Sequence, residues 1–175
     1  VREVGSDVER VTAVAEALPT DVSLRVDANG AWSTTQATEF IQQIADLELE
    51  YVEQPLGPSE LDATADLRRL GTPIALDESV ARHGIEAILE AEAADAIVLK
   101  PMSIGGPDLT RAVAETAREN DVKTVLSTTI DGVVARTAAI HVALSLPDIP
   151  PSGLATATLL DRDLAPDPTP VSAGH

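Results

Sequence analysis

Four short apolar stretches, each ending on a charged residue, recur at nearly equal intervals along this chain. Their last residues are Asp27, Glu53, Asp77 and Lys100, so the intervals are 26, 24 and 23 residues. Each interval has room for one strand and one crossover helix, which is the repeat of a parallel β–α array. Equivalent strand ends in such an array lie side by side on one face. The pattern therefore predicts an α/β fold in which three acids and a lysine converge on one pocket.

Hydrophobic periodicity and capping residues predict the remaining elements. We expect strands over residues 22–26, 51–53, 73–77, 96–100, 124–128 and 153–156. We expect helices that open at the capping box Ser6–Glu9 and at Ser33 with Gln36, and helices over 59–70, 85–93, 107–119 and 133–144. Residues 102–106 are expected to be a flexible loop. Without a break in composition we expect one domain over 1–164, and a proline-rich disordered tail over 165–175.

Composition and charge exclude several classes of protein. With 29 acidic against 12 basic residues the net charge is −17, which repels nucleic acid and anionic membranes. No apolar run reaches membrane-spanning length and no signal pattern opens the chain, so we expect a cytoplasmic protein. The absence of cysteine rules out disulfides and thiolate metal sites. The excess of acids, with only two lysines, is typical of halophilic proteins, although an ordinary acidic protein is the alternative.

Three of the four strand ends offer carboxylates. Asp27, Glu53 and Asp77 form a set of hard oxygen ligands that suits Mg²⁺, and a divalent cation would relieve their mutual repulsion. Each acid also has a simpler interpretation. Asp27 can form an Asx turn, Glu53 can be a solvated strand end, and Asp77 or Glu78 can cap the next helix.

Lys100 ends an apolar strand just before Pro101. Its side chain either extends to solvent or lies in the pocket, where a metal and apolar walls would suit it to proton transfer.

Four motifs together resemble the muconate-lactonizing subgroup of the enolase superfamily. They are Val-Asp-Ala-Asn-Gly-Ala-Trp at 26–32, Glu-Gln-Pro at 53–55, Asp-Glu-Ser at 77–79 and Lys-Pro-x-x-x-Gly-Gly at 100–106. The resemblance implies a TIM-type (β/α)7β barrel, here an incomplete barrel covering about strands 3 to 8. It also implies Mg²⁺ on the three acids, an enolate stabilised by the metal, and Lys100 as the lysine of the sixth strand.

Two further segments are similar to loops of the o-succinylbenzoate synthases within that subgroup. These enzymes dehydrate a cyclohexadiene carboxylate in menaquinone biosynthesis, and the resemblance implies that Lys100 stabilises the intermediate as a cation. It implies substrate-binding roles for Asn29, Ser127, Thr128, Asp131, Gly153 and Leu154. The sequence departs from the family at Asp131, where a glutamate is common, and at Ala155, where the last-strand motif often has an aspartate.

The family also has a second catalytic lysine, on a Lys-x-Lys strand before the first helix. This chain has Val1–Val4 there, and Arg2 stays protonated at neutral pH, so it cannot act as a base. Because the chain begins with Val1 and its only methionine is Met102, we expect a fragment whose lysine pair lies upstream. Alone it is expected to be inactive. Replacement of the lysine, with loss of activity, is the alternative.

Two other functions compete with an Mg²⁺-dependent lyase. One is a racemase or epimerase of N-acylated amino acids or dipeptides, with Lys100 as a base, but Gly153–Thr156 lacks the Asp-x-Asp that dipeptide epimerases usually carry. The other is a non-catalytic partial barrel. The predicted partner is a small-molecule carboxylate, with neither nucleic acid nor membrane, and an oligomer is possible.

Overall fold

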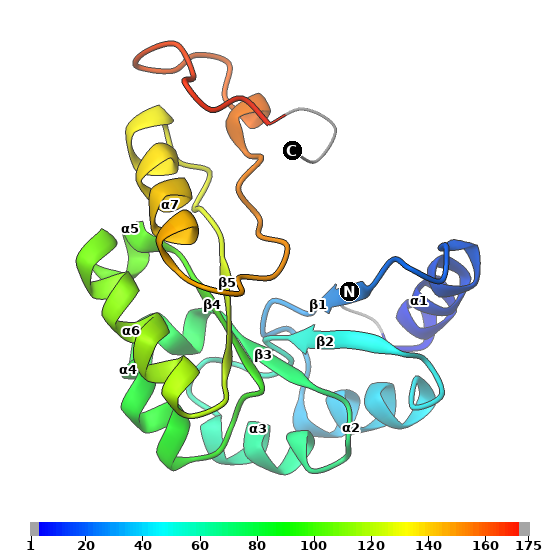
Figure 1. The fold of residues 1–175 in the computed structure, drawn as a ribbon. Coiled ribbons are helices and arrows are strands. Elements are labelled where there is room, and N and C mark those ends of the chain that lie inside the picture. The colour runs from blue at the N-terminus through cyan, green and yellow to red at the C-terminus, as the bar shows by residue number, and fades with distance from the viewer. Residues whose placement is uncertain (1–3, 172–175) are drawn as a thin grey trace. The chain divides into compact units, whose positions relative to one another are not determined.

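Strands and helices alternate along the chain, as the recurring pattern predicts (Figure 1). The computed structural model describes residues 4–171 and divides into two compact units, Val1–Ala96 and Ile97–His175. Arg2, in the segment where the family carries its lysine pair, lies outside the described residues. No helix among residues 4–171 is long and apolar enough to cross a membrane.

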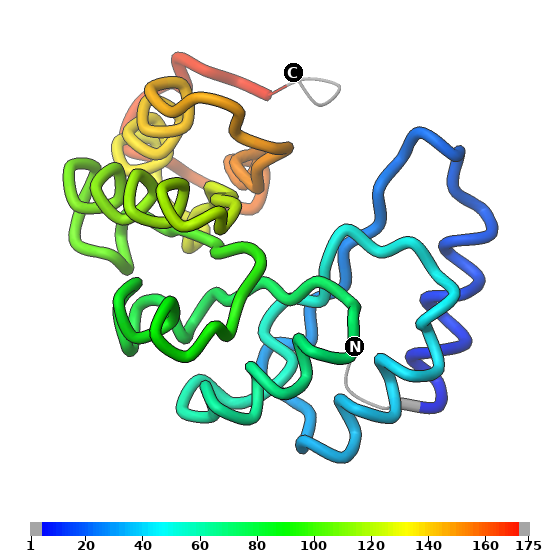
Figure 2. Tube along the Cα trace, turned by 60° about the horizontal axis from the view of Figure 1, so that its bottom comes forward, coloured from blue at the N-terminus to red at the C-terminus, as the bar shows by residue number. Residues whose placement is uncertain are grey.

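Over residues 4–95, the first unit contains three strands and four helices. Its elements are α1 Val4–Ala17, β1 Leu24–Asp27, α2 Thr34–Gln43, β2 Leu49–Glu53, α3 Leu61–Arg68, β3 Ile74–Leu76 and α4 Glu78–Glu90. β1 pairs with β2 and β2 pairs with β3, both in parallel. Along the Cα trace, α1 contacts α2 and α2 contacts α3, so these helices form a row (Figure 2).

Local sequence signals account for α2. Ser33 Oγ accepts a hydrogen bond from Gln36 N at 3.3 Å, and Gln36 Oε1 accepts one from Ser33 N at 2.9 Å, which confirms the predicted cap. On the buried face of the helix, the Phe40 ring lies 4.4 Å from the ring of Trp32. This contact packs the loop that follows β1 against the helix.

The second unit carries the remaining elements. They are β4 Ala96–Leu99, whose first residue closes the first unit, α5 Pro101–Ile104, α6 Pro107–Glu119, β5 Lys123–Leu126, α7 Val133–Ser145 and the 3₁₀ turn Ala157–Leu159. All four residues of β4 are buried, as expected for a continuous apolar run. Helix α6 packs against both β5 and α7.

Several element boundaries differ from the predictions. Helix α1 begins at Val4, so Ser6 and Asp7 lie inside it instead of capping it, and the buried Asp7 carboxylate accepts from Arg10 Nη1 at 2.8 Å. The predicted loop at 102–106 is wrong in part, because Pro101 opens the short helix α5 and the left-handed Gly105 ends it. Helix α4 starts seven residues earlier than predicted and is kinked at Gly84 (φ 79°).

Candidate active site

The strand register brings the three predicted acids to one edge of the first unit's sheet. Asp27 and Glu53 are direct partners across β1 and β2. Glu53 in turn pairs with Ala75 on β3, and Asp77 follows two residues later, just past the end of that strand. Their positions at successive carboxyl ends are those that the spacing predicts.

A bidentate ion pair next to the strand ends ties β1 to β2. Arg25 donates from Nε to Glu50 Oε2 at 2.8 Å and from Nη2 to Glu50 Oε1 at 3.0 Å. The Arg25 guanidinium also lies 5.0 Å from the centre of the Tyr51 ring. The hydrogen bonds that Arg25 donates to Glu50 raise the pKa of Arg25, and burial raises the pKa of Tyr51 to about 12, so both side chains are protonated at neutral pH.

Asp27 makes the Asx turn that the sequence allows. Its Oδ1 accepts from Asn29 N at 2.8 Å and its Oδ2 accepts from Asn29 Nδ2 at 2.7 Å. A carboxylate has about four acceptor positions, and these two hydrogen bonds use one position on each oxygen. Asn29, predicted to bind substrate, orients Asp27 in this structure.

The other two acids differ in their surroundings. Asp77 occupies the N-cap position of α4, but its carboxylate makes no capping hydrogen bond. The capping interpretation is therefore wrong for this residue. The side chains of Glu53 and Asp77 are both half-buried.

The fit of these acids to Mg²⁺ rests on donor chemistry and strand register. Three carboxylate oxygens are the hard ligands that Mg²⁺ prefers, and Mg²⁺ completes its shell with waters or substrate oxygens. Within the described part of the chain, no group of three or more histidine, cysteine, aspartate or glutamate side chains is already gathered tightly enough to hold a metal ion. The metal site therefore stays a prediction.

A buried residue that the sequence reasoning did not single out connects these strand ends. Gln54, between Glu53 and Pro55, is 1% exposed and hydrogen-bonds to residues that follow both β2 and β3. The sequence signal that could have identified Gln54 is a polar residue between an apolar strand and a proline.

In the second unit, Lys100 directly follows β4. Its side chain is half-buried, and its carbonyl oxygen accepts from Ser103 N at 2.8 Å, which starts the short helix α5. Ser127 directly follows the adjacent strand β5, and its N–H donates to Leu99 O at 2.9 Å. Lys100 and Ser127 therefore lie at neighbouring strand ends of this unit.

The predicted substrate loops of the second unit meet beside β5. Ser127 and Gly153 form a single parallel bridge, so the strand predicted over 153–156 is reduced to one pair. Thr128 Oγ1 lies 2.8 Å from Thr156 Oγ1, and Leu154 between the two contacts is half-buried. Asp131 is turned back onto its own loop, where it accepts from the backbone N–H and hydroxyl of Thr129. Their roles in substrate binding stay predictions.

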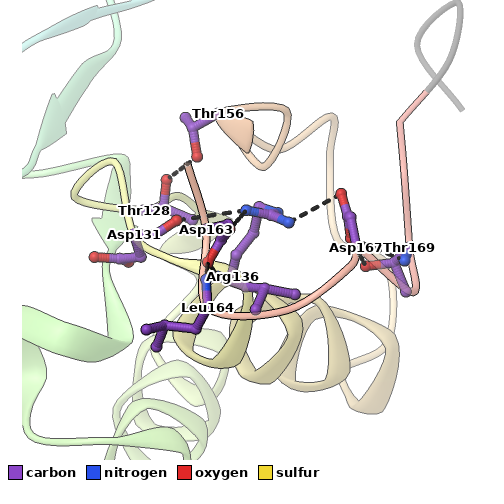
Figure 3. Close-up of polar contacts among 9 residues, drawn as sticks. Thr128, Asp131, Arg136, Thr156, Asp163, Leu164, Asp167 and Thr169 are labelled. Atoms are coloured by element: carbon purple, nitrogen blue, oxygen red, sulfur yellow. Dashed lines mark hydrogen bonds and ion pairs between the residues drawn. The ribbon is translucent and has the colours of Figure 1, made fainter. Parts of the chain in front are cut away.

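A buried arginine holds the C-terminal segment onto the same loop (Figure 3). The Arg136 side chain is 1% exposed and lies 2.9 Å from Asp167 Oδ2 and 3.6 Å from Asp163 Oδ2. Its Nη1 also donates to Asp131 O at 3.4 Å. Asp163 Oδ1 accepts from Val133 N at 2.9 Å at the start of α7.

Hydrogen bonds stabilise the charged forms of these two acids. Those from Val133 N and Leu164 N, followed by the one from Arg136, lower the pKa of Asp163, and the bond from Thr169 N lowers that of Asp167. Asp167 and Thr169 make these specific contacts within the segment 165–175, for which the sequence predicts a disordered tail. The signal in the sequence was a lone arginine within the apolar helix Val133–Ser145.

Known proteins with similar sequences are o-succinylbenzoate synthases. The chain is 40% identical over 166 residues to the enzyme of Thermobifida fusca (strain YX), which covers 93% of this chain and 51% of that protein. It is 39% identical over 170 residues to the enzyme of Mycobacterium ulcerans (strain Agy99), covering 95% of this chain and 50% of that protein. The chain thus spans about half the length of the curated relatives it matches.

Solved structures with the same fold include several activities. The N-succinyl Arg/Lys racemase from Bacillus cereus ATCC 14579 superposes with a TM-score of 0.86 at 27% identity, over 92% of this chain and 44% of that one. The muconate lactonizing enzyme from Pseudomonas putida superposes with a TM-score of 0.85 at 26% identity, over 91% of this chain and 46% of that one. The dipeptide epimerase from Enterococcus faecalis V583, complexed with Mg and the dipeptide L-Leu-L-Tyr, superposes with a TM-score of 0.84 at 27% identity. The superposition covers 92% of this chain and 46% of that one.

These likenesses confirm the predicted fold class, an α/β chain that forms part of a TIM-type barrel. The family model described as Enolase C-terminal domain-like matches residues 1–175. With the strand-end acids in register and this match along its length, the chain belongs to the Enolase C-terminal domain-like family.

Proposed function

We propose that the full-length protein is an Mg²⁺-dependent carbon–oxygen lyase that forms o-succinylbenzoate from a cyclohexadiene carboxylate in menaquinone biosynthesis. The observation that carries this proposal is the 40% identity to the Thermobifida fusca enzyme over 93% of the chain. The proposed substrate is a small carboxylate, and a cytoplasmic location is part of the same proposal.

In the first unit, Asp27, Glu53 and Asp77 would hold the metal. When bound, Mg²⁺ supplies positive charge that stabilises the enolate-like form of the substrate carboxylate. The chain's own contribution is to keep three negative charges together at successive strand ends, with Asn29 orienting Asp27 through two hydrogen bonds.

In the second unit, Lys100 would present its ammonium group to the substrate ring and stabilise the negative charge that develops there. Ser127, Thr128, Asp131, Gly153 and Leu154 would line the substrate side of this unit's loops. Loss of water also needs a base that removes a proton and an acid that protonates the departing hydroxyl. We propose that the second lysine of the family, upstream of residue 1, serves this purpose.

A racemase or epimerase is the second candidate. The racemase and epimerase structures superpose on this chain as well as the muconate lactonizing enzyme does, and Lys100 would then exchange a proton with the α-carbon. Against it stands the segment Gly153–Thr156, which has no acidic residue. A non-catalytic partial barrel is the remaining alternative.

An activity screen of the full-length protein distinguishes these candidates. The protein would be assayed with Mg²⁺, in low and in molar KCl, against the cyclohexadiene carboxylate, N-succinyl amino acids and dipeptides. We expect o-succinylbenzoate to form, and to stop forming after treatment with EDTA. Racemisation without dehydration would favour the second candidate, and no turnover of any substrate would favour the non-catalytic one. The halophilic interpretation predicts higher activity in molar KCl.

A further inference from the structure

Gln54 adopts an unusual backbone conformation at the end of β2. Its φ is +39°, in the left-handed region that residues other than glycine seldom occupy, and its side chain is 1% exposed. Such strain persists only where the surrounding structure holds it in place, and it often marks a functional position. The contacts of Gln54 show what holds it.

The Gln54 side-chain amide hydrogen-bonds at both of its ends. Its Oε1 accepts from Asp77 N at 3.1 Å and from Ser79 N at 3.2 Å, the amides that open α4. Its Nε2 donates to Leu56 O at 2.9 Å and to Ser79 Oγ at 2.8 Å. Two backbone donors on one side and two oxygen acceptors on the other fit only one orientation of the amide.

The Gln54 backbone reaches the two neighbouring strands. Its N–H donates to Ala75 O on β3 at 2.8 Å, and its carbonyl accepts from Gly30 N at 2.7 Å in the loop after β1. This one residue therefore contacts Gly30 in the loop after Asp27, Leu56 in the loop after Glu53, and Asp77 itself.

We propose that Gln54 is a positioning residue that sets the spacing of the three carboxylates for the metal. This inference rests on the proposed Mg²⁺ site. Asp77 follows a strand of only three residues and has a backbone (φ −111°, ψ −82°) outside the regular regions, so β3 alone does not fix its carboxylate. The Oε1 acceptor fixes the amide of Asp77 relative to Glu53, the residue next to Gln54. Residues that hold metal ligands in place through hydrogen bonds change the affinity for the metal without contacting it.

Two variants of the full-length protein separate the two ends of the amide. Gln54→Met removes both ends, and Ser79→Ala removes one acceptor of the donor end only. Calorimetric titration with Mg²⁺ alone is expected to show a roughly 10- to 100-fold loss of affinity for Gln54→Met. Ser79→Ala should stay close to the wild type. Both variants lose buried hydrogen bonds, so a general loss of stability would weaken Mg²⁺ binding in both.

Hydrogen exchange of the wild type provides a test that needs no variant. If Gln54 holds the start of α4, the amides of Asp77 and Ser79 exchange slowly with or without Mg²⁺. Rapid exchange of both amides, wild-type Mg²⁺ affinity in Gln54→Met, or an equal loss in Gln54→Met and Ser79→Ala would each overturn the inference. A wild-type protein that binds no Mg²⁺ would instead contradict the proposed function, and the exchange of the two amides would still decide whether Gln54 positions Asp77.

Discussion

Replacing Arg136 with methionine should release the C-terminal segment from α7. Methionine retains an apolar stem of similar length but loses the guanidinium, which lies 2.9 Å from Asp167 Oδ2 and 3.6 Å from Asp163 Oδ2. The arginine side chain is 1% exposed, whereas the two acids are 22% and 20% exposed. The guanidinium is therefore buried, whereas the two carboxylates are partly hydrated.

The exposure of the acids sets the size of the effect. Removing one partner of a fully buried ion pair costs about 3–5 kcal/mol because the other charge stays buried, and a surface pair contributes about 0–1 kcal/mol. Asp163 and Asp167 can regain part of their hydration, so the expected loss for Arg136→Met lies between these limits, at about 2 kcal/mol. That loss corresponds to a roughly 30-fold larger population of the open segment.

Hydrogen–deuterium exchange measured by mass spectrometry reads this opening directly. Peptides that include Val133, Leu164 and Thr169 should exchange faster in Arg136→Met, because the N–H groups of these residues donate to the two acids. The matched control is Arg162→Met, since Arg162 pairs with Asp161 at 3.7 Å with both side chains more than nine-tenths exposed. No change is expected there. Equal exchange in Arg136→Met and the wild type would refute the view that the buried arginine holds the segment.

The remaining predictions concern pH, the metal and the lysine. Hydrogen bonds lower the folded-state pKa of Asp163 below the ordinary value of 3.8. The contribution of Asp163 to stability is therefore present above pH 3.8 and is lost as the pH falls through the folded-state pKa. The unfolding midpoint of the wild type should drop on acidification more than that of Asp163→Asn. The metal site is tested by replacing each proposed ligand with its amide, as Asp27→Asn, Glu53→Gln and Asp77→Asn. Each variant should bind Mg²⁺ more weakly in a calorimetric titration and lose turnover. Unchanged Mg²⁺ affinity in all three would show that these residues do not form the metal site. Lys100→Ala should leave Mg²⁺ affinity intact while kcat falls by about two to four orders of magnitude, and a near-normal kcat would place Lys100 outside the reaction.

The order of elements and the positions of the strand ends follow from the sequence. Residues within one turn or one strand decide them, such as the Ser33–Gln36 cap and the apolar run of β4. The repeat of about 25 residues then places Asp27 opposite Glu53, because parallel strands joined by helices of similar length meet in register. Local rules failed at α1, where the predicted capping residues Ser6 and Asp7 lie inside the helix, and at α5, where Pro101 opens a short helix in place of the predicted loop.

Tertiary structure alone decided which polar side chains hold these elements in place. The Gln54 amide bonds to Ser79, 25 residues away, and Asp163 bonds to Val133, 30 residues away. No short-range periodicity reports such pairs, because each forms only when packed elements bring a buried donor to a specific acceptor. A buried polar group must find its partners within the fold, so the sequence shows that Gln54 and Arg136 stand in apolar surroundings, and only the packing shows what they bind.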